Sequence, residues 1–405
     1  MSTQALAPSP ATAQPSAARL IGVICLTLAL GYLTVLIGVY RDGHFLTDEQ
    51  GQPIANDFVN VYAAGRLANN GNAAGAYDWT THKAAEREAV GHDFENYFGW
   101  HYPPIFLFAA GALATLPYLV AAVTWLALTL IAYAATLAGI LGSRTGILLA
   151  LGFPAALWNI TAGQNGFLTA SLIGGTLALL ERRPALAGLC LGLLTYKPQF
   201  GLLFPIVLIA DRRWVTLMVA AAVALSLMAA SWIAYGSASW AAFLHWMPVT
   251  SRVILSEGGT QFARLQSPLG FVRAHGGSEP LAWAVQGAAA LALAIGLVWL
   301  WRSRVPYELK AAALAAGTLI ATPYVFIYDE AVLAVAVAFL LRHALARGLT
   351  IGEAVGLGAA GALVLIFPYM TTQLGLAAAL IVLALIVARA FAELRPLVPA
   401  ETGTQ

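Results

Sequence analysis

Apolar runs recur along nearly the whole 405-residue chain, and several reach the ~20 residues that an α-helix needs to cross a bilayer. A chain in lipid must satisfy its own backbone hydrogen bonds, which only helices and closed β-barrels can do. The runs are continuous rather than alternating in polarity, and this favours helices. Charged residues make up only 10% of the sequence, against roughly 25% in soluble domains. The sequence therefore predicts an all-α polytopic membrane protein.

The apolar segments predict roughly 11–13 membrane helices, some of them short or re-entrant. Residues 1–18 are uncharged and rich in Ala, Ser and Pro, which is typical of a disordered tail. We expect residues 19–395 to form one membrane domain and 396–405 to form a second short tail. The apolar segments lie at 20–41, 104–118, 119–141, 145–159, 166–181, 184–196, 199–210, 214–235, 281–301, 308–322, 327–341, 351–367 and 372–389.

Basic clusters between the segments predict the orientation of the chain, because short loops rich in Lys and Arg stay in the cytoplasm. They place the N-terminus in the cytoplasm and two large loops, 42–103 and 236–280, on the outer side. Between Pro103 outside and Arg144 inside the number of crossings must be odd, yet two apolar segments lie there. Partial insertion of 104–118 is one explanation, and the sequence alone leaves the topology of 104–144 open. The clusters are Arg144, Arg182 with Arg183, Arg212 with Arg213, Arg302 with Arg304, Arg342 with Arg347, and Arg389 with Arg395.

The first outer loop is polar and acidic. It holds nine of the 19 Asp and Glu residues of the chain and three of the 21 Lys and Arg residues. Asp57 starts a stretch with Tyr62 and Arg66, and a carboxylate at the membrane surface is a candidate general base. The alternative is that Asp57 only caps the helix that follows it.

Two short motifs carry polar groups next to apolar segments. His101 and Tyr102 precede two prolines, which favour the start of a helix, and this could be an ordinary helix start with interfacial aromatic residues. Gln164 and Asn165 lie between glycines at the tip of a predicted hairpin. They could form a simple turn or bind sugar hydroxyls through their amides.

Lys197 lies between two apolar segments that are each too short to span a bilayer, next to Pro198 and Gln199. An ionisable group at membrane depth indicates function, and a lysine can bind a lipid-linked phosphate. The alternative is that Lys197 extends to the headgroups. In the 236–280 loop, Arg264 and Gln266 are candidates for a phosphate clamp or part of a solvated surface.

Tyr328 and Asp329 begin an otherwise apolar segment. A carboxylate at the start of a helix suits the positive end of the helix dipole, so this position has a structural explanation as well as a functional one.

Taken in order, these motifs resemble glycosyltransferase family 87, the polyprenyl-phosphate-mannose-dependent mannosyltransferases. The resemblance covers roughly residues 50–345 and rests on the order and spacing of motifs that are weak singly. They are Asp57-Phe58-x-x-x-Tyr62, Tyr102-Pro103-Pro104, Gly163-Gln164-Asn165, Gly188-x-x-x-Gly192-x-x-x-Tyr196-Lys197-Pro198 and Pro323-x-x-x-x-Tyr328-Asp329.

The resemblance implies a GT-C-type fold and transfer of a hexose, mannose above all, from a polyprenyl phosphate to a glycolipid or glycan acceptor. It places Asp57 as the base, on the outer face of the membrane. We expect an inverting displacement, and the Ala-, Leu- and Gly-rich composition favours a bacterial plasma membrane. Lys197, Arg264 and Arg66 would bind the donor phosphate, with Tyr328 and Asp329 in support. His101, Tyr62, Tyr102, Gln164, Asn165, Gln199 and Gln266 would contact sugar or acceptor.

No cofactor is expected, since cations can serve a phosphate leaving group, although a divalent metal is an alternative. No basic tract indicates nucleic acid. Two other functions stay open: a flippase or transporter of lipid-linked sugars, and a polysaccharide ligase or polymerase.

Overall fold

The computed structural model describes residues 14–259, 261–370 and 372–394. Within these ranges the chain is helical, and its only extended pairing is two isolated bridges, Phe45 to Thr47 and Thr47 to Pro53. Residues 1–13 of the first predicted tail and all of the second lie outside the described residues. The prediction of an all-α polytopic membrane protein is confirmed.

Six helices of the described chain are long and apolar enough to cross a membrane. A seventh span is formed if the bent pair α6 and α7, which meet at 59°, counts as one. The six helices are α1 (Gln14–Arg41), α5 (Tyr118–Leu141), α11 (Trp214–Ser251), α13 (Glu279–Arg302), α16 (Ile351–Ile366) and α17 (Leu374–Leu394), and the bent pair is α6 (Ser143–Gly152) with α7 (Ala155–Ala162).

Shorter helices fill the middle of the bundle. α14 and α15 are buried along most of their length, and α8 packs against α15 and α5. The chain leaves helical geometry between α9 and α10 at Lys197 and Pro198, where two 3-10 turns, η4 and η5, replace a continuous span. These elements are α8 (Gly166–Leu179), α9 (Pro184–Leu193), η4 (Leu194–Tyr196), η5 (Pro198–Gly201), α10 (Leu203–Ala210), α14 (Tyr307–Ala321) and α15 (Ala331–Arg347).

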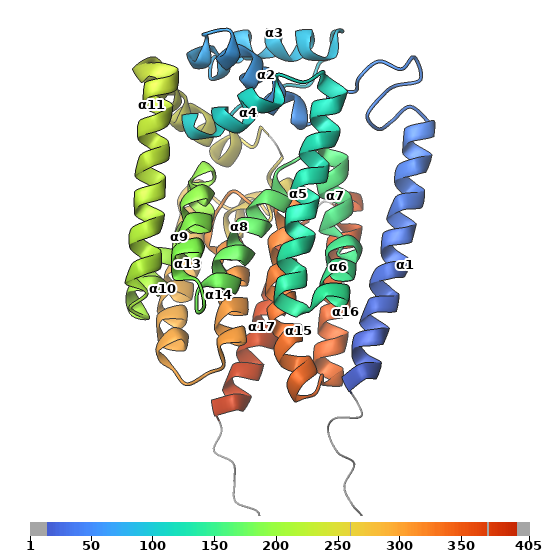
Figure 1. Ribbon diagram of the computed structural model, residues 1–405, viewed down its shortest axis with the longest axis vertical. Helices are drawn as coiled ribbons and strands as arrows, with labels where there is room; N and C mark the ends of the chain where they lie inside the picture. The colour runs from blue at the N-terminus through green and yellow to red at the C-terminus, as the bar shows by residue number, and fades with distance from the viewer. Residues whose placement is uncertain (1–13, 260, 371, 395–405) are drawn as a thin grey trace, which may run out of the picture.

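The two ends of the bundle differ. The turns α5–α6, α13–α14 and α15–α16, which carry basic clusters, lie at the end where α1 begins and α17 finishes (Figure 1). The opposite end carries a layer made from the first polar loop and the start of the apolar segment after it: α2 (Phe58–Asn69), η2 (Ala73–Ala76), α3 (Trp79–Val90), η3 (Pro104–Phe106) and α4 (Leu107–Leu113). We call this group of helices the end layer.

α4 explains the odd number of crossings. It has only seven residues and lies beside α2 in the end layer (Figure 1). The two helices touch so closely that a Cβ atom on Gly65 would lie 2.0 Å from the carbonyl oxygen of Ala110. Segment 104–118 is therefore not a span, and α5 alone crosses the bundle between Pro103 and Arg144.

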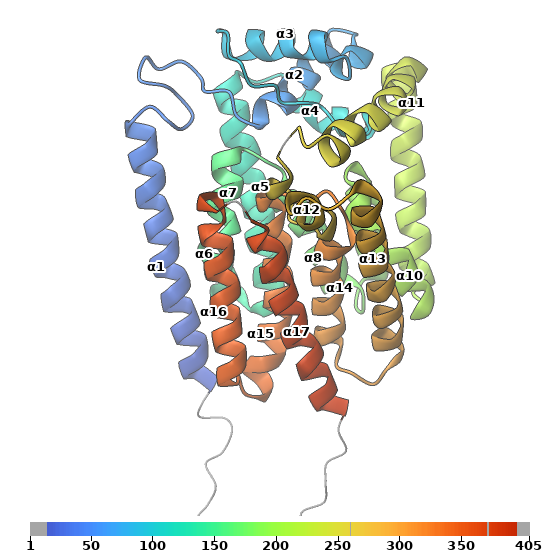
Figure 2. The same ribbon diagram turned by 180° about the vertical axis from the view of Figure 1, so that it is seen from behind.

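The second predicted loop, 236–280, is largely helical. α11 continues past Gly236 to Ser251, and only Gly236 leaves helical geometry, with φ 76° and ψ 167°. A positive φ is readily adopted by glycine, so the helix changes direction there and resumes. Its second half turns over the bundle towards the end layer (Figure 2). A π-helical turn (Arg252–Ser256), η7 (Phe262–Arg264) and α12 (Pro268–Ala274) follow.

Candidate active site

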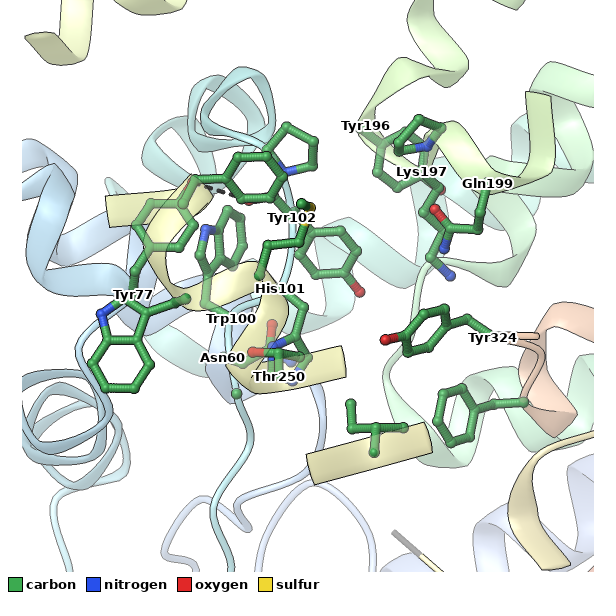
Figure 3. Close-up of a pocket in the computed structure, with 18 of the residues that line it drawn as sticks. Asn60, Tyr77, Trp100, His101, Tyr102, Tyr196, Lys197, Gln199, Thr250 and Tyr324 are labelled. Atoms are coloured by element: carbon green, nitrogen blue, oxygen red, sulfur yellow. Dashed lines mark hydrogen bonds between the residues drawn. The ribbon is translucent and has the colours of Figure 1, made fainter. Parts of the chain in front are cut away.

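A cavity of about 270 Å³ lies between the end layer and the ends of the core helices. Most of its wall comes from α2, segment 99–103, the η4–η5 turn, the second half of α11 and segment 324–329, and Tyr77 and Gln164 complete it (Figure 3). Nine of the 21 lining residues are Phe, Trp or Tyr. The lining residues are Asn60, Tyr77, Gly99, Trp100, His101, Tyr102, Pro103, Gln164, Tyr196, Lys197, Pro198, Gln199, Phe243, Trp246, Met247, Thr250, Ile254, Tyr324, Phe326, Tyr328 and Asp329.

Asp57 stands just before α2 at the edge of this cavity. Its side chain makes no capping hydrogen bond, because Asn56 Oδ1 accepts from the backbone N–H of Phe58 (3.1 Å). The interpretation of Asp57 as a simple helix cap is therefore wrong. Instead, Asp57 Oδ2 accepts a hydrogen bond from Gln164 Nε2 at 3.1 Å. Asp57 does not line the cavity itself, but Gln164 does.

Gln164 is held by a buried hydrogen-bond network. Its Oε1 accepts from the Tyr102 hydroxyl (3.3 Å) and from the backbone N–H of Asn165 (3.2 Å). Asn165 Nδ2 donates to the same hydroxyl at 2.6 Å. The Tyr196 hydroxyl lies 3.3 Å from the backbone oxygen of Asn165 and 2.6 Å from Thr169 Oγ1. Because every partner is fixed, the Gln164 amide presents its N–H group to Asp57.

A buried ion pair forms the opposite wall. Lys197 Nζ lies 2.7 Å from Asp329 Oδ1, and the two side chains are 7% and 1% exposed. Asp329 Oδ2 accepts from the backbone N–H of Phe326 (3.1 Å). The ammonium group also lies near the rings of Tyr328 and Phe200, at 5.2 and 5.6 Å from their centroids. The break in the helix at Pro198 thus places a cation beside the cavity with a carboxylate to hold it.

The end-layer groups have shifted pKa values. Burial raises the pKa of Asp57, while the Gln164 hydrogen bond and the charges of Arg264 and Lys197 oppose that rise. A carboxylate with a raised pKa is a stronger base. Burial lowers the pKa of His101 to about 4, so this imidazole is neutral at pH 7.

The structure brings seven of the predicted residues into the cavity wall and leaves the others outside it. His101, Tyr102, Gln164, Lys197, Gln199, Tyr328 and Asp329 line the cavity. Asn165 supports Tyr102 from behind. Arg264 is exposed and does not line the cavity, although its charge acts on Asp57.

Arg66, Tyr62 and Gln266 make structural contacts elsewhere. Arg66 pairs with Glu88 at 3.5 Å, and the Tyr62 hydroxyl donates to the backbone oxygen of Leu116. Gln266 is buried, donates to the backbone of Ala263 and Arg264, and accepts from Gly375 N–H.

Several lining residues escaped prediction. Phe243, Trp246, Met247 and Thr250 come from the second half of α11, within a segment that we expected to be a loop. Their spacing of three, one and three residues is that of one helix face, and this signal could have identified them. Asn60 also lines the cavity, three residues after Asp57.

Within the described ranges, no group of three or more His, Cys, Asp and Glu side chains is placed to hold a metal ion. The two carboxylates nearest the cavity, Asp57 and Asp329, each accept a hydrogen bond from a side-chain nitrogen.

One comparison with known proteins gives a match. The family model for glycosyltransferase family 87 matches residues 100–323, which is more than half of the chain. The matched part includes Tyr102, Gln164 and Lys197, while Asp57 and Asp329 lie on either side of it. No curated protein and no solved structure matches the chain.

Proposed function

The chain belongs to glycosyltransferase family 87, which makes it a membrane glycosyltransferase, and we propose that it moves a hexose from a polyprenyl-phosphate sugar to a glycolipid or glycan acceptor. Mannose is the proposed sugar. The observation that carries this proposal is the arrangement of Asp57 and Lys197 about one cavity. A base that is bonded to the wall residue Gln164 lies at the edge of the cavity, and a buried cation lies in another part of the wall.

The proposed reaction is a single inverting displacement. The acceptor hydroxyl oxygen bonds to the anomeric carbon while its proton passes to Asp57. The bond between that carbon and the phosphate oxygen breaks, and its electron pair leaves with the lipid phosphate. Gln164 holds Oδ2 of Asp57, which leaves Oδ1 free of hydrogen bonds from the described residues and able to accept the proton.

Lys197 is the proposed stabiliser of the leaving phosphate. Negative charge grows on the bridging oxygen as the bond breaks, and a cation in a site shielded from water stabilises such charge strongly. Asp329 would position the ammonium group. The exposed Arg264 would add a longer-range positive charge, which lowers the pKa of Asp57.

The cavity favours a monophosphate donor over the pyrophosphate donor of a polysaccharide polymerase or ligase. Among the lining residues Lys197 is the single Lys or Arg. A pyrophosphate carries more charge and is typically bound by several cationic groups. Transport of a lipid-linked sugar is the alternative that needs no base, and the oriented Asp57 argues against it.

We also propose that the end layer faces the outside of a bacterial plasma membrane, with the N-terminus in the cytoplasm. The basic turns lie at the end of the bundle opposite to α2, α3 and α4 (Figure 1). The positive-inside rule assigns that basic end to the cytoplasm.

The test is sugar transfer and sugar release from synthetic polyprenyl-phosphate-mannose by the purified protein, with Asp57→Asn beside the wild type. We expect turnover by the wild type and a fall of at least about a thousand-fold in the variant, because the base is lost. Asp78→Asn is the matched control, since Asp78 caps α3 in the same end layer and does not line the cavity. Equal turnover by Asp57→Asn and wild type would remove Asp57 from the mechanism.

A further inference from the structure

Asn60 presents an unused polar group to the cavity. The residue is only 5% exposed and lines the cavity wall. Its Oδ1 is buried and accepts no hydrogen bond within the described part of the chain. Buried amides without partners are uncommon in folded proteins, and a bound ligand is one explanation for them.

The position of Asn60 relative to Asp57 indicates what it would bind. Residues three apart on a helix lie on the same face, with Cβ atoms about 5–6 Å apart. Asn60 thus stands beside the base on the wall formed by the end layer, and Figure 3 shows it at the cavity with His101 and Thr250. Lys197 belongs to a different wall, formed by the η4–η5 turn. The acceptor must approach the base, and the donor phosphate must approach the cation.

We propose that Asn60 binds the acceptor, through a hydroxyl group adjacent to the one that attacks. This rests on the proposed function and extends it. The acceptor is then a sugar with vicinal hydroxyls rather than an isolated alcohol. One hydroxyl donates its proton to Asp57, and its neighbour pairs with the Asn60 amide. The aromatic walls at Trp100 and Trp246 give the apolar face of a sugar ring a surface to pack against.

Sugar binding without a donor tests this directly. The full-length protein is placed in lipid nanodiscs, because glycoside detergents would compete for the site. Emission from tryptophans such as Trp100 and Trp246 reports binding. The probes are methyl α-mannoside and methyl α-glucoside, each beside its 3-deoxy form. Removal of the 3-hydroxyl leaves neither ring with two hydroxyls on adjacent carbons.

We expect the wild type to bind at least one parent sugar about five- to ten-fold more tightly than its 3-deoxy form, the size of one hydrogen bond. Asn60→Ala should bind both forms equally and weakly. Asn69→Ala is the control, since Asn69 is on the same helix and bonds to Gly111 away from the cavity. It should keep the discrimination of the wild type.

Two results would overturn the proposal. One is that the wild type binds no parent sugar, or binds parent and 3-deoxy forms alike. The other is that Asn60→Ala keeps the preference of the wild type. Release of mannose from polyprenyl-phosphate-mannose by the wild type, measured separately, tests the donor. A failure there, with Asn60-dependent sugar binding intact, would refute the proposed donor and leave the role of Asn60 standing.

Discussion

Lys197 and Asp329 form an ion pair of 2.7 Å across 132 residues of sequence, with both side chains almost completely buried. Removal of one member of such a pair leaves an uncompensated buried charge and costs about 3–5 kcal/mol, whereas removal of both costs much less. Mutation of either residue should therefore change the stability of the protein as well as the proposed site.

Lys197→Met should lower turnover of the proposed donor, polyprenyl-phosphate-mannose, by about 10²–10³-fold, because the charge proposed to stabilise the leaving phosphate is gone. Asp329→Asn should destabilise the protein by about 3 kcal/mol. The double variant should unfold at a higher temperature than Lys197→Met alone and stay inactive. Turnover assays and thermal unfolding of the three variants measure these effects. Turnover by Lys197→Met at the wild-type rate would exclude Lys197 from the reaction.

Arg264→Gln should move the acidic limb of the pH–rate profile to higher pH. The charge of Arg264 lowers the pKa of Asp57, so its removal lets that pKa rise, and the base then loses its proton only at higher pH. Since Arg264 is exposed, added salt should weaken the difference. The measurement is kcat/KM against pH at low and high salt. Arg252→Gln is the control in the same segment, and identical profiles for Arg264→Gln and wild type would contradict the prediction.

Glu86 in the end layer should make stability depend on pH. Burial raises the pKa of this carboxyl to about 8 from 4.5, against the opposing charge of Lys83. The folded protein therefore keeps a proton that the unfolded chain loses near pH 4.5, and the free energy of unfolding falls as the pH rises towards 8. Glutamine does not ionise, so Glu86→Gln should remove the contribution of this carboxyl to the pH dependence of the unfolding free energy. At pH 8 the variant should be more stable than the wild type by about 2–4 kcal/mol. Thermal unfolding of the wild type and Glu86→Gln at pH 5 and 8 tests this. An equal loss of stability between pH 5 and pH 8 in both proteins would refute the prediction.

Gly166→Ala should disturb the proposed site by displacing the segment that carries Asp329. A Cβ atom there would lie 2.0 Å from the backbone oxygen of Tyr328, so segment 328–329 must move and carry Asp329 away from Lys197. We expect a loss of about 1–3 kcal/mol in unfolding free energy and a lower rate of turnover. Gly139→Ala is the matched control, because nothing lies within 4 Å of its added atom. Comparable losses in both variants would show that close packing at Gly166 is not the cause.

The sequence predicted helix positions well because apolar length directly reflects the thickness of a bilayer. The sequence-based prediction failed where a helix changes direction. The segment after residue 235 looked like a loop, yet α11 only turns at Gly236, and one residue in a positive-φ conformation leaves no mark on composition. Gln164 and Lys197, which line the cavity, stood out in the sequence because polar groups next to helix breaks are uncommon in a membrane chain.

Arg66 and Tyr62 show a second kind of difference, because neither lines the cavity. At ~100° per residue, Tyr62 lies about 140° and Arg66 about 180° around α2 from Asp57, so neither can share its face. Asn60 lies about 60° away and can. The helix itself was expected, and its periodicity would have favoured Asn60 over the other two. The pairing of Lys197 with Asp329 could not be predicted, because it depends on how distant helices pack.

The turn at Gly236 has a consequence for where substrates meet the enzyme. The straight part of α11, from Trp214 to Tyr235, is about 33 Å long at ~1.5 Å per residue, close to the ~30 Å hydrocarbon thickness of a bilayer. If this part spans the bilayer, the glycine stands at the depth where acyl chains give way to headgroups. The bend then carries the cavity residues Phe243 and Trp246 over the bundle near the level of the lipid phosphates. The proposed lipid-linked donor would react there while its hydrocarbon chain stays in the membrane.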